Sequence, residues 1–305
     1  MKFRMRALSL VFLAAPVMLA GCATYDFSKP PPAQSQPISV SFSNEGPNGW
    51  TDLPIGTYRV PNSTVIIAGQ LKNPGIGMMF GLVGVLAENS VGASEGKHAV
   101  SDVQAALQVD LTQQAGALTQ QAMTSGRYGQ AFSAAADANG PTLVVSPYTV
   151  ITFVNDTEVR PYVILKATLK PSASGGNLWT TRYIASSGKP VQLAGENSLT
   201  ANSGQLLKDA QALDLQRAVN AMLDDVATRR GRDQNTQMYV ETSVPYVRQR
   251  FGLTGVQLSD DGGALVFLPH VADANVFAGV EILDESVTLH RPATADDKVK
   301  ALDDK

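Results

Sequence analysis

The sequence predicts an α+β fold, in which a mostly antiparallel sheet with two main helices is followed by a small β-rich module. Apolar residues recur at helical spacing after Ser101 and again over 203–229, which indicates the two helices. The runs 142–154 and 158–169 are rich in Val, Ile, Thr and Tyr, which strands favour. Residues 238–289 are strand-like throughout and form the expected module.

The composition is that of a globular, acidic chain. Of its 305 residues, 44% are hydrophobic and 17% are charged, which allows a sizeable core in one large or two smaller domains. The net charge is −3, and because residues 1–21 hold three basic and no acidic residues, the remainder has 21 basic against 27 acidic residues. A chain of that sign does not attract phosphate backbones, so no nucleic-acid partner is expected.

The beginning of the chain has the layout of an export signal. Lys2, Arg4 and Arg6 supply a positive start, and an apolar run follows over 8–20. This run is too short to span a membrane comfortably. The sequence therefore predicts a cleaved leader over 1–21.

The residues Leu19, Ala20, Gly21 and Cys22 resemble the lipobox of bacterial lipoproteins. The resemblance implies cleavage before Cys22, a diacylglycerol thioether on its sulfur, and acylation of the new amino terminus by a chain such as palmitate. Two or three acyl chains hold a protein stably on a membrane, whereas one binds marginally. Because Ala23 follows the cysteine, and not Asp, the resemblance favours the periplasmic face of the outer membrane over the inner membrane or the cell surface. The alternative is a secreted protein with a cysteine near its cleavage site.

The chain divides into five parts by composition. The stretch DFSKPPPAQSQ is Pro-rich and polar, so it is expected to stay extended and to lift the folded part off the bilayer. A polar break, RDQNTQ, separates the second helix from the β-rich module. The parts are a signal peptide (1–21), a Pro-rich tether (22–36), an α/β domain (37–231), the β-rich module (232–292) and a flexible tail (293–305).

Short strands are expected first, over 38–42, 58–60 and 64–68. The uncharged run 76–87 is too short for a membrane span and suits a buried helix. It is either a core segment or a surface that contacts lipid or a partner's apolar groove.

The first main helix begins at Ser101, which fits a capping box with Gln104, and it ends at Gly126. A weaker helix is expected over 128–138. The apolar residues of the first helix are Val103, Leu107, Leu111, Leu118 and Ala122.

A hairpin and a long helix follow. The pair Asn155-Asp156 joins the two Val/Ile-rich runs into a hairpin, and 179–185 adds a strand. The long helix is expected to be capped at Gly231. Its expected buried face consists of Leu206, Ala210, Leu213, Val219, Leu223 and Val226.

The order of these elements resembles several families of periplasmic α/β lipoproteins that assist envelope assembly or transport. Residues 143–185 contribute most to this resemblance, as an apolar strand, a polar-turned hairpin and a strand with Trp179 and Tyr183. The resemblance implies a helper or scaffold role in the cell envelope and not a reaction.

Residues for catalysis do not gather in the sequence. There is no G-x-S-x-G elbow, and Cys22 is expected to be acylated. The pair Asp224-Asp225 is expected on the solvated face of the long helix, and the DDGG run at 260–263 in a hairpin turn. With one cysteine and three histidines, neither a metal site nor a cofactor is expected. The histidines, expected on the surface or in turns, are His98, His270 and His290.

Three functional hypotheses follow. The first is a lipid-anchored, non-catalytic adaptor or scaffold that binds an envelope protein through an exposed sheet edge or the β-rich module. The second is an accessory carrier of a hydrophobic ligand or lipid, suggested by the run 76–87. The third is an envelope hydrolase with a dispersed active site, which needs a pocket that joins a histidine to an acid and a nucleophile. A carbohydrate groove lined by exposed Trp and Tyr is a further alternative.

Overall fold

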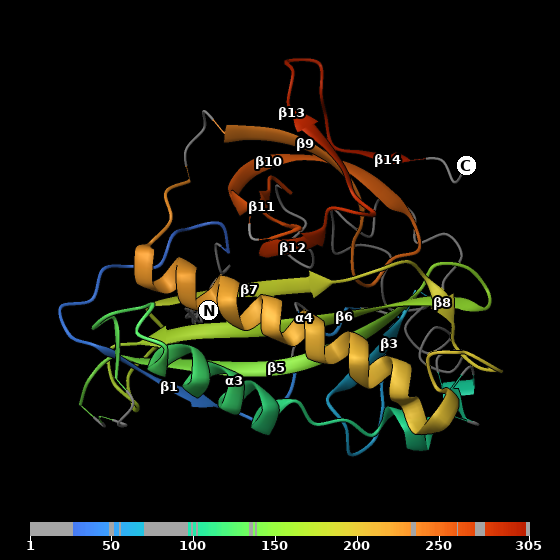
Figure 1. Ribbon diagram of the computed structural model, residues 1–305, viewed down its shortest axis with the longest axis horizontal. Coiled ribbons are helices and arrows are strands. Elements are labelled where there is room, and N and C mark those ends of the chain that lie inside the picture. Colours follow the sequence, from blue (N-terminus) through green and yellow to red (C-terminus); the bar gives the residue numbers. More distant parts are fainter. Residues whose placement is uncertain are drawn as a thin grey trace, which may run out of the picture.

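A large mixed sheet flanked by two helices makes up the computed structural model, so the α+β class is confirmed (Figure 1). The leader, the lipobox and the run 76–87 lie outside the residues that the structure describes. The described residues are 27–48, 52–54, 56–69, 97–98, 100–101, 103–133, 137, 139–232, 236–260, 262–271 and 278–302.

The sheet of the described residues has 14 strands and mixes parallel with antiparallel pairs. Its main path runs in the order β13-β9-β10-β11-β12-β7-β6-β5-β1-β4. The strands are β1 (Ile38–Phe42), β2 (Tyr58–Arg59), β3 (Val65–Ala68), β4 (Phe132–Ser133), β5 (Thr142–Phe153), β6 (Glu158–Lys170), β7 (Trp179–Ser186), β8 (Val191–Gln192), β9 (Gln237–Ser243), β10 (Arg250–Asp260), β11 (Ala264–Pro269), β12 (Val280–Asp284), β13 (Leu289–Pro292) and β14 (Lys300–Leu302).

The predicted hairpin forms as β5–β6, in the part of the sheet that contacts the two helices. Its strands alternate side chains between two buried faces, which suits β-branched residues. At its turn, the Asn155 side-chain oxygen accepts hydrogen bonds from the backbone of Thr157 (3.0 Å) and Glu158 (2.7 Å). This Asx-type turn reverses the chain.

The C-terminal strands continue the same sheet. Strand β12 pairs in parallel with β7, whereas β9 to β12 pair with one another antiparallel. Within 293–305, the expected flexible tail, β14 pairs with β10.

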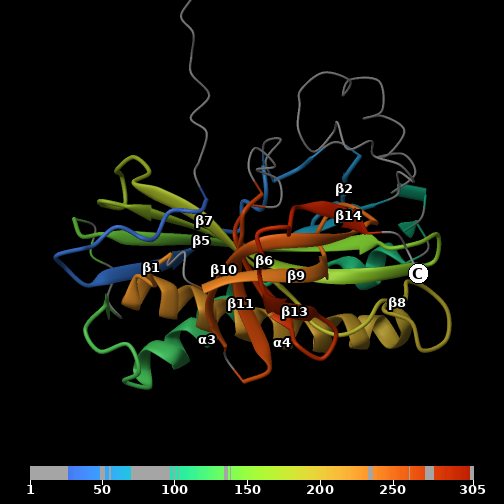
Figure 2. The same cartoon turned by 90° about the horizontal axis from the view of Figure 1, so that it is seen from above.

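The helices α3 (Thr112–Thr124) and α4 (Ala201–Thr228) lie on one side of β1, β5, β6 and β7 (Figure 2). One hydrophobic core fills the space between these helices and the sheet. A second core lies on the opposite face, where side chains of β5, β6 and β7 pack against side chains of β9, β10 and β11. The strongly curved sheet therefore buries both faces of its central strands.

The first expected helix is interrupted. A short 3₁₀ turn, η1 (Gln104–Leu107), precedes α3, and residues 108–111 are not helical. The hydroxyl of Ser63 donates to the Leu107 carbonyl at 2.7 Å, and the Thr64 amide donates to the Val109 carbonyl at 3.1 Å. These tertiary hydrogen bonds take backbone groups that a continuous helix would use. The predicted helix over 128–138 is also wrong, because Phe132 and Ser133 form β4 beside β1.

The long helix α4 buries a different face from the one expected in its first half. Leu206 and Leu213 are 41% and 43% exposed, whereas Gln211 and Asp214 are buried. The Gln211 side-chain amide donates to the Thr149 hydroxyl at 2.7 Å, which fixes this orientation. Val219, Leu223 and Val226 are buried as predicted, and the C-cap is Arg229 in a left-handed conformation instead of Gly231.

Candidate functional site

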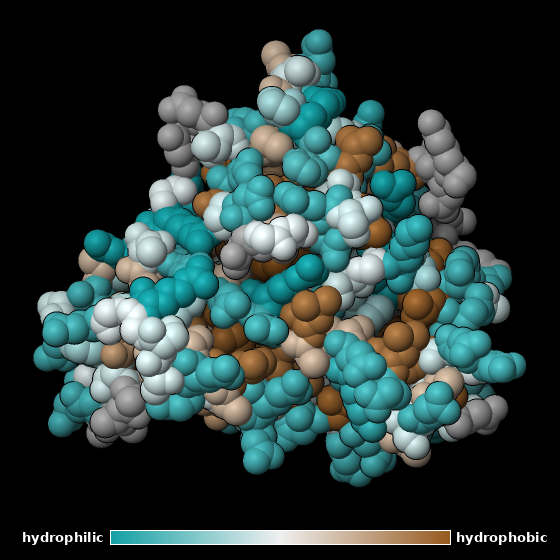
Figure 3. Space-filling model, in the orientation of Figure 1, coloured by the Kyte–Doolittle hydropathy of each residue, from teal (hydrophilic) through white to brown (hydrophobic). Residues whose placement is uncertain are grey.

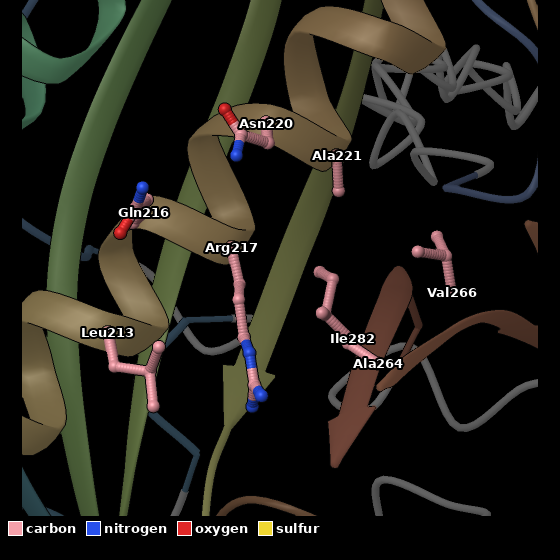
Figure 4. A pocket seen from close by; sticks show the side chains of 8 residues that line it. All are labelled: Leu213, Gln216, Arg217, Asn220, Ala221, Ala264, Val266 and Ile282. Carbon is pink, nitrogen blue, oxygen red and sulfur yellow. The ribbon is translucent and has the colours of Figure 1, made fainter. Parts of the chain in front are cut away.

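A groove lies between α4 and the strands β11 and β12 (Figure 4). Its volume is about 210 Å³. In Figure 4 the side chains of Arg217 and Ala221 lie on the side of α4 that faces the strands, and Arg217 runs alongside them. The residues that line it, here called the groove, are Leu213, Gln216, Arg217, Asn220, Ala221, Ala264, Val266 and Ile282.

The groove has an apolar floor and a polar rim that includes one ion-paired arginine. The side chains of Ala264, Val266 and Ile282 are buried, whereas Gln216 is exposed. Arg217 donates to the Asp284 carboxylate at 3.1 Å, so the cation in the lining is neutralised by a neighbouring anion. An apolar floor with a polar rim is the arrangement of protein–protein interfaces.

An exposed apolar stripe leads into the groove along α4. Leu206, Ala210 and Leu213 lie at positions i, i+4 and i+7 of the helix and therefore on one face. We call these three residues the outer stripe. Figure 3 shows hydrophobic surface, interrupted by hydrophilic surface, across the side of the molecule that α4 crosses.

A second hollow has a volume of about 430 Å³, but its side chains offer little chemistry for a site. Its lining is mostly turn residues with small or polar side chains and includes one cation and one carboxylate. The residues are Asn44, Arg59, Val60, Pro61, Asn62, Ser63, Thr64 and Asp110. The Asp110 carboxylate accepts from the Thr112 amide at 2.8 Å, which is a local turn contact.

A buried ion cluster lies on the sheet face that α4 does not cover. Asp52 accepts hydrogen bonds from Arg182 at 3.1 Å and from Lys166. The guanidinium of Arg182 also lies 4.3 Å from the centre of the Phe27 ring. The Tyr246 hydroxyl donates to the Asp52 backbone carbonyl at 3.2 Å. The cluster holds segments that are far apart in the chain.

The C-terminal end of α4 holds a second buried cluster. Asp224 and Asp225 are both buried, so their predicted place on a solvated face is wrong. Asp225 accepts from the Tyr183 hydroxyl at 2.8 Å and from Arg232 at 2.8 and 3.0 Å. The donors to Asp224 are Arg127 at 2.7 Å and Arg230 at 3.0 Å. Because each carboxylate has charged donors, its burial is compensated.

Two buried carboxyl groups stand outside these clusters. Burial raises the pKa of Glu281 to about 8, and its Oε1 has no hydrogen-bond partner among the described residues. Burial likewise raises the pKa of Asp214 to about 7. Both groups therefore hold a proton at a pH where a solvated carboxyl group has lost it.

The three histidines lie apart from these clusters. His98, His270 and His290 are exposed, as predicted. His290 Nε2 lies 3.9 Å from Glu285 Oε1 on the surface. The run 260–263 turns the chain between β10 and β11, as predicted, although residue 261 is outside the described residues. The lipobox residues Leu19, Ala20, Gly21 and Cys22 cannot be placed, because they also lie outside.

Sequence reasoning missed the buried charges. A signal for two of them was present: Arg182 lies in the middle of the predicted strand WTTRYIA, and Glu281 stands alone between Val280 and Ile282. A lone charge inside an apolar strand often has a buried partner or an altered pKa. The partners themselves, such as Asp52, come from distant segments and leave no local pattern.

Comparisons with known proteins assign no relative: no protein-family model and no curated protein matches this chain. Over the described ranges, no helix combines the length and the apolar character needed to cross a membrane. In the same part of the chain, no three His, Cys, Asp or Glu side chains are placed to hold a metal ion.

Proposed function

We propose that this protein is a lipid-anchored, non-catalytic adaptor of the cell envelope that binds an apolar segment of a partner protein in the groove. The observation behind this proposal is the distribution of polar and apolar side chains in the first half of α4. The helix buries Gln211 and Asp214 and leaves Leu206 and Leu213 in solvent. Burying a carboxyl group costs free energy that burying leucine would not. An outer surface that binds a partner explains why leucines remain there.

The size and charge of the groove define its occupant. Small-molecule pockets have volumes of about 300–1,000 Å³, so about 210 Å³ fits one or two apolar side chains of a peptide better than a whole lipid. Because Arg217 is paired with Asp284, the lining offers no free charge. The expected occupant is therefore an uncharged apolar segment, such as a helix with anchors at i and i+4.

The cellular location is part of the proposal. The lipobox resemblance at Leu19 to Cys22, with Ala23 after it, supports an anchor in the outer membrane with the protein facing the periplasm. The two other hypotheses require different structural features. A lipid carrier needs a larger apolar cavity, and a hydrolase needs a histidine beside an acid and a nucleophile.

The test is site-specific photocrosslinking in cells that express the full-length lipoprotein. A crosslinking amino acid replaces Gln216 at the rim of the groove, in the parent and in a Leu213→Glu variant. Leu289→Glu is the matched control, because Leu289 is 53% exposed on β13, away from the groove. We expect one envelope protein in the adduct, lost in Leu213→Glu and retained in Leu289→Glu.

Other results would change the proposed binding surface, the partner or the function. An adduct lost in Leu289→Glu but kept in Leu213→Glu would move the binding surface to the outer β strands and refute the groove. Adducts between two copies of this chain would make the groove a self-association surface. Acyl lipid that co-purifies, without a protein adduct, would favour the carrier hypothesis.

A further inference from the structure

The N-terminal segment is fixed to the folded part immediately after the expected tether begins. Phe27 is buried, and its backbone carbonyl accepts from the Thr181 hydroxyl at 2.8 Å. The Lys29 carbonyl accepts from the Trp179 indole at 2.9 Å. These contacts join the segment to the first residues of β7.

Two further contacts strengthen this attachment. The Phe27 ring lies beneath the buried Arg182 guanidinium, at 4.3 Å from its centre. The Ser28 carbonyl accepts from Arg232 at 3.3 Å, and Arg232 is held by Asp225 at the end of α4. The segment is thus bound to both the sheet and the helix.

The attachment leaves a short connection to the expected lipid. Cys22 and Phe27 are five residues apart, and an extended chain spans at most about 3.3–3.6 Å per residue, or roughly 17 Å here. The strand β6 (Glu158–Lys170), at about 3.4 Å per residue, is roughly 40 Å long. Phe27 contacts Thr181 and Arg182, in the first half of β7. The short connection therefore holds this half of the sheet near the membrane, and the opposite end of β6 lies farther from the anchor.

The surface at this end suits a bilayer. Leu178, which precedes Trp179, is 53% exposed. Lys29 is exposed, and its backbone carbonyl bonds to Trp179, the residue after Leu178. Arg229 is the exposed C-cap of α4, three residues before Arg232, which contacts Ser28. Cations at this end attract phosphate headgroups. Carboxylates also lie at this end: Asp224 and Asp225 are in the last turn and a half of α4, and Asp260 follows Ser259, which Arg230 contacts. The contact thus depends on the short connection and the apolar Leu178 more than on net charge.

We propose that the end of the molecule formed by Phe27, Lys29, Leu178 and Arg229 rests on the lipid surface, so that β6 and α4 point away from the membrane. We call these four residues the membrane-proximal end. This inference rests on the lipid anchor of the proposed function. The partner segment then binds beside α4, along the side of an upright molecule.

The test measures energy transfer from single labels to acceptors in lipid headgroups. The full-length lipoprotein is reconstituted in vesicles of phosphatidylethanolamine and phosphatidylglycerol. Since the natural cysteine is acylated, a dye labels one new thiol: Leu178→Cys at the membrane-proximal end or Glu196→Cys near β8. Both positions are exposed. We expect severalfold higher transfer from position 178 than from position 196.

A lengthened connection provides the matched control. A Gly/Ser insert of about 15 residues before Tyr25, with a root-mean-square length of roughly 20 Å, leaves the Phe27 attachment intact. We expect it to reduce transfer from position 178 and to narrow the difference between the positions.

The outcomes separate the anchor from the orientation. Equal transfer from both positions, in a protein that floats with the vesicles, would overturn the orientation and leave the anchor in place. A protein that does not float with vesicles, and behaves like the Cys22→Ala form, would refute the anchor itself.

Discussion

The buried Glu281 makes a strong prediction about stability and pH. Its carboxyl group lies in the second core, between β7 and β11, and burial raises its pKa from the ordinary 4.5 to about 8. Between these values the folded protein holds a proton that the unfolded chain has lost. The stability from this proton is fully present below pH 4.5 and is lost as pH rises toward 8.

The magnitude follows from this interval. For each pH unit over which only the folded protein keeps the proton, the free energy of unfolding falls by about 1.4 kcal/mol. Over the interval from 4.5 to about 8, the fall is roughly 5 kcal/mol. A Glu281→Gln variant carries no proton to lose. Its free energy of unfolding, relative to the parent, should therefore rise by about 3–5 kcal/mol between pH 4.5 and pH 8.

The assay is urea denaturation of the Cys22→Ala variant with and without Glu281→Gln, monitored by circular dichroism across this pH range. The glutamine amide has its own cost of burial, which does not depend on pH, so the slope of the difference is the measured quantity. A difference that stays flat would show that Glu281 ionises in the folded protein near its ordinary pKa. The assigned burial would then be wrong.

Three further changes, the last with a matched control variant, test other parts of the fold. Burial raises the pKa of Asp214 from 3.8 to about 7. The stability of Asp214→Asn relative to the parent should therefore rise as pH increases from 3.8 to about 7 and stay constant above it, as the melting temperatures of the two proteins would show. Asp52→Asn removes the charge beside the buried Arg182 and should cost about 3–5 kcal/mol in urea denaturation, and no loss would refute the ion pair. Gly255→Ala would place a Cβ atom 2.2 Å from a carbonyl oxygen of β11 and should cost about 1–3 kcal/mol. Gly176→Ala, with no neighbour within 4 Å, should leave the melting temperature nearly unchanged.

The strands of this protein could be predicted from the sequence because their signals are local. Strand β1 was expected at its observed bounds, and β5, β6 and β7 within one or two residues. Each of these segments is rich in β-branched or aromatic residues, and turn residues such as Asn155 separate them. Neither signal depends on the rest of the chain.

The helices were less predictable because tertiary contacts decide them. The backbone near Leu107 bonds to the turn at Ser63 and Thr64, which interrupts the predicted first helix. In α4, hydropathy alone favours burial of Leu206 and Leu213, and only the contact of Gln211 with β5 reveals the other orientation. The groove could not be predicted, because three of its eight lining residues come from strands beyond residue 260.

The pairing of β12 with β7 has a consequence for the order of folding. Val280 pairs with Tyr183, nearly a hundred residues earlier in the chain. Contacts between such distant segments form slowly, because a long loop must close before they stabilise anything. Until β12 arrives, β7 has an open edge that can pair with another chain. We expect a chain that ends before residue 280 to aggregate, so protection of this edge by a chaperone would increase the yield of folded protein.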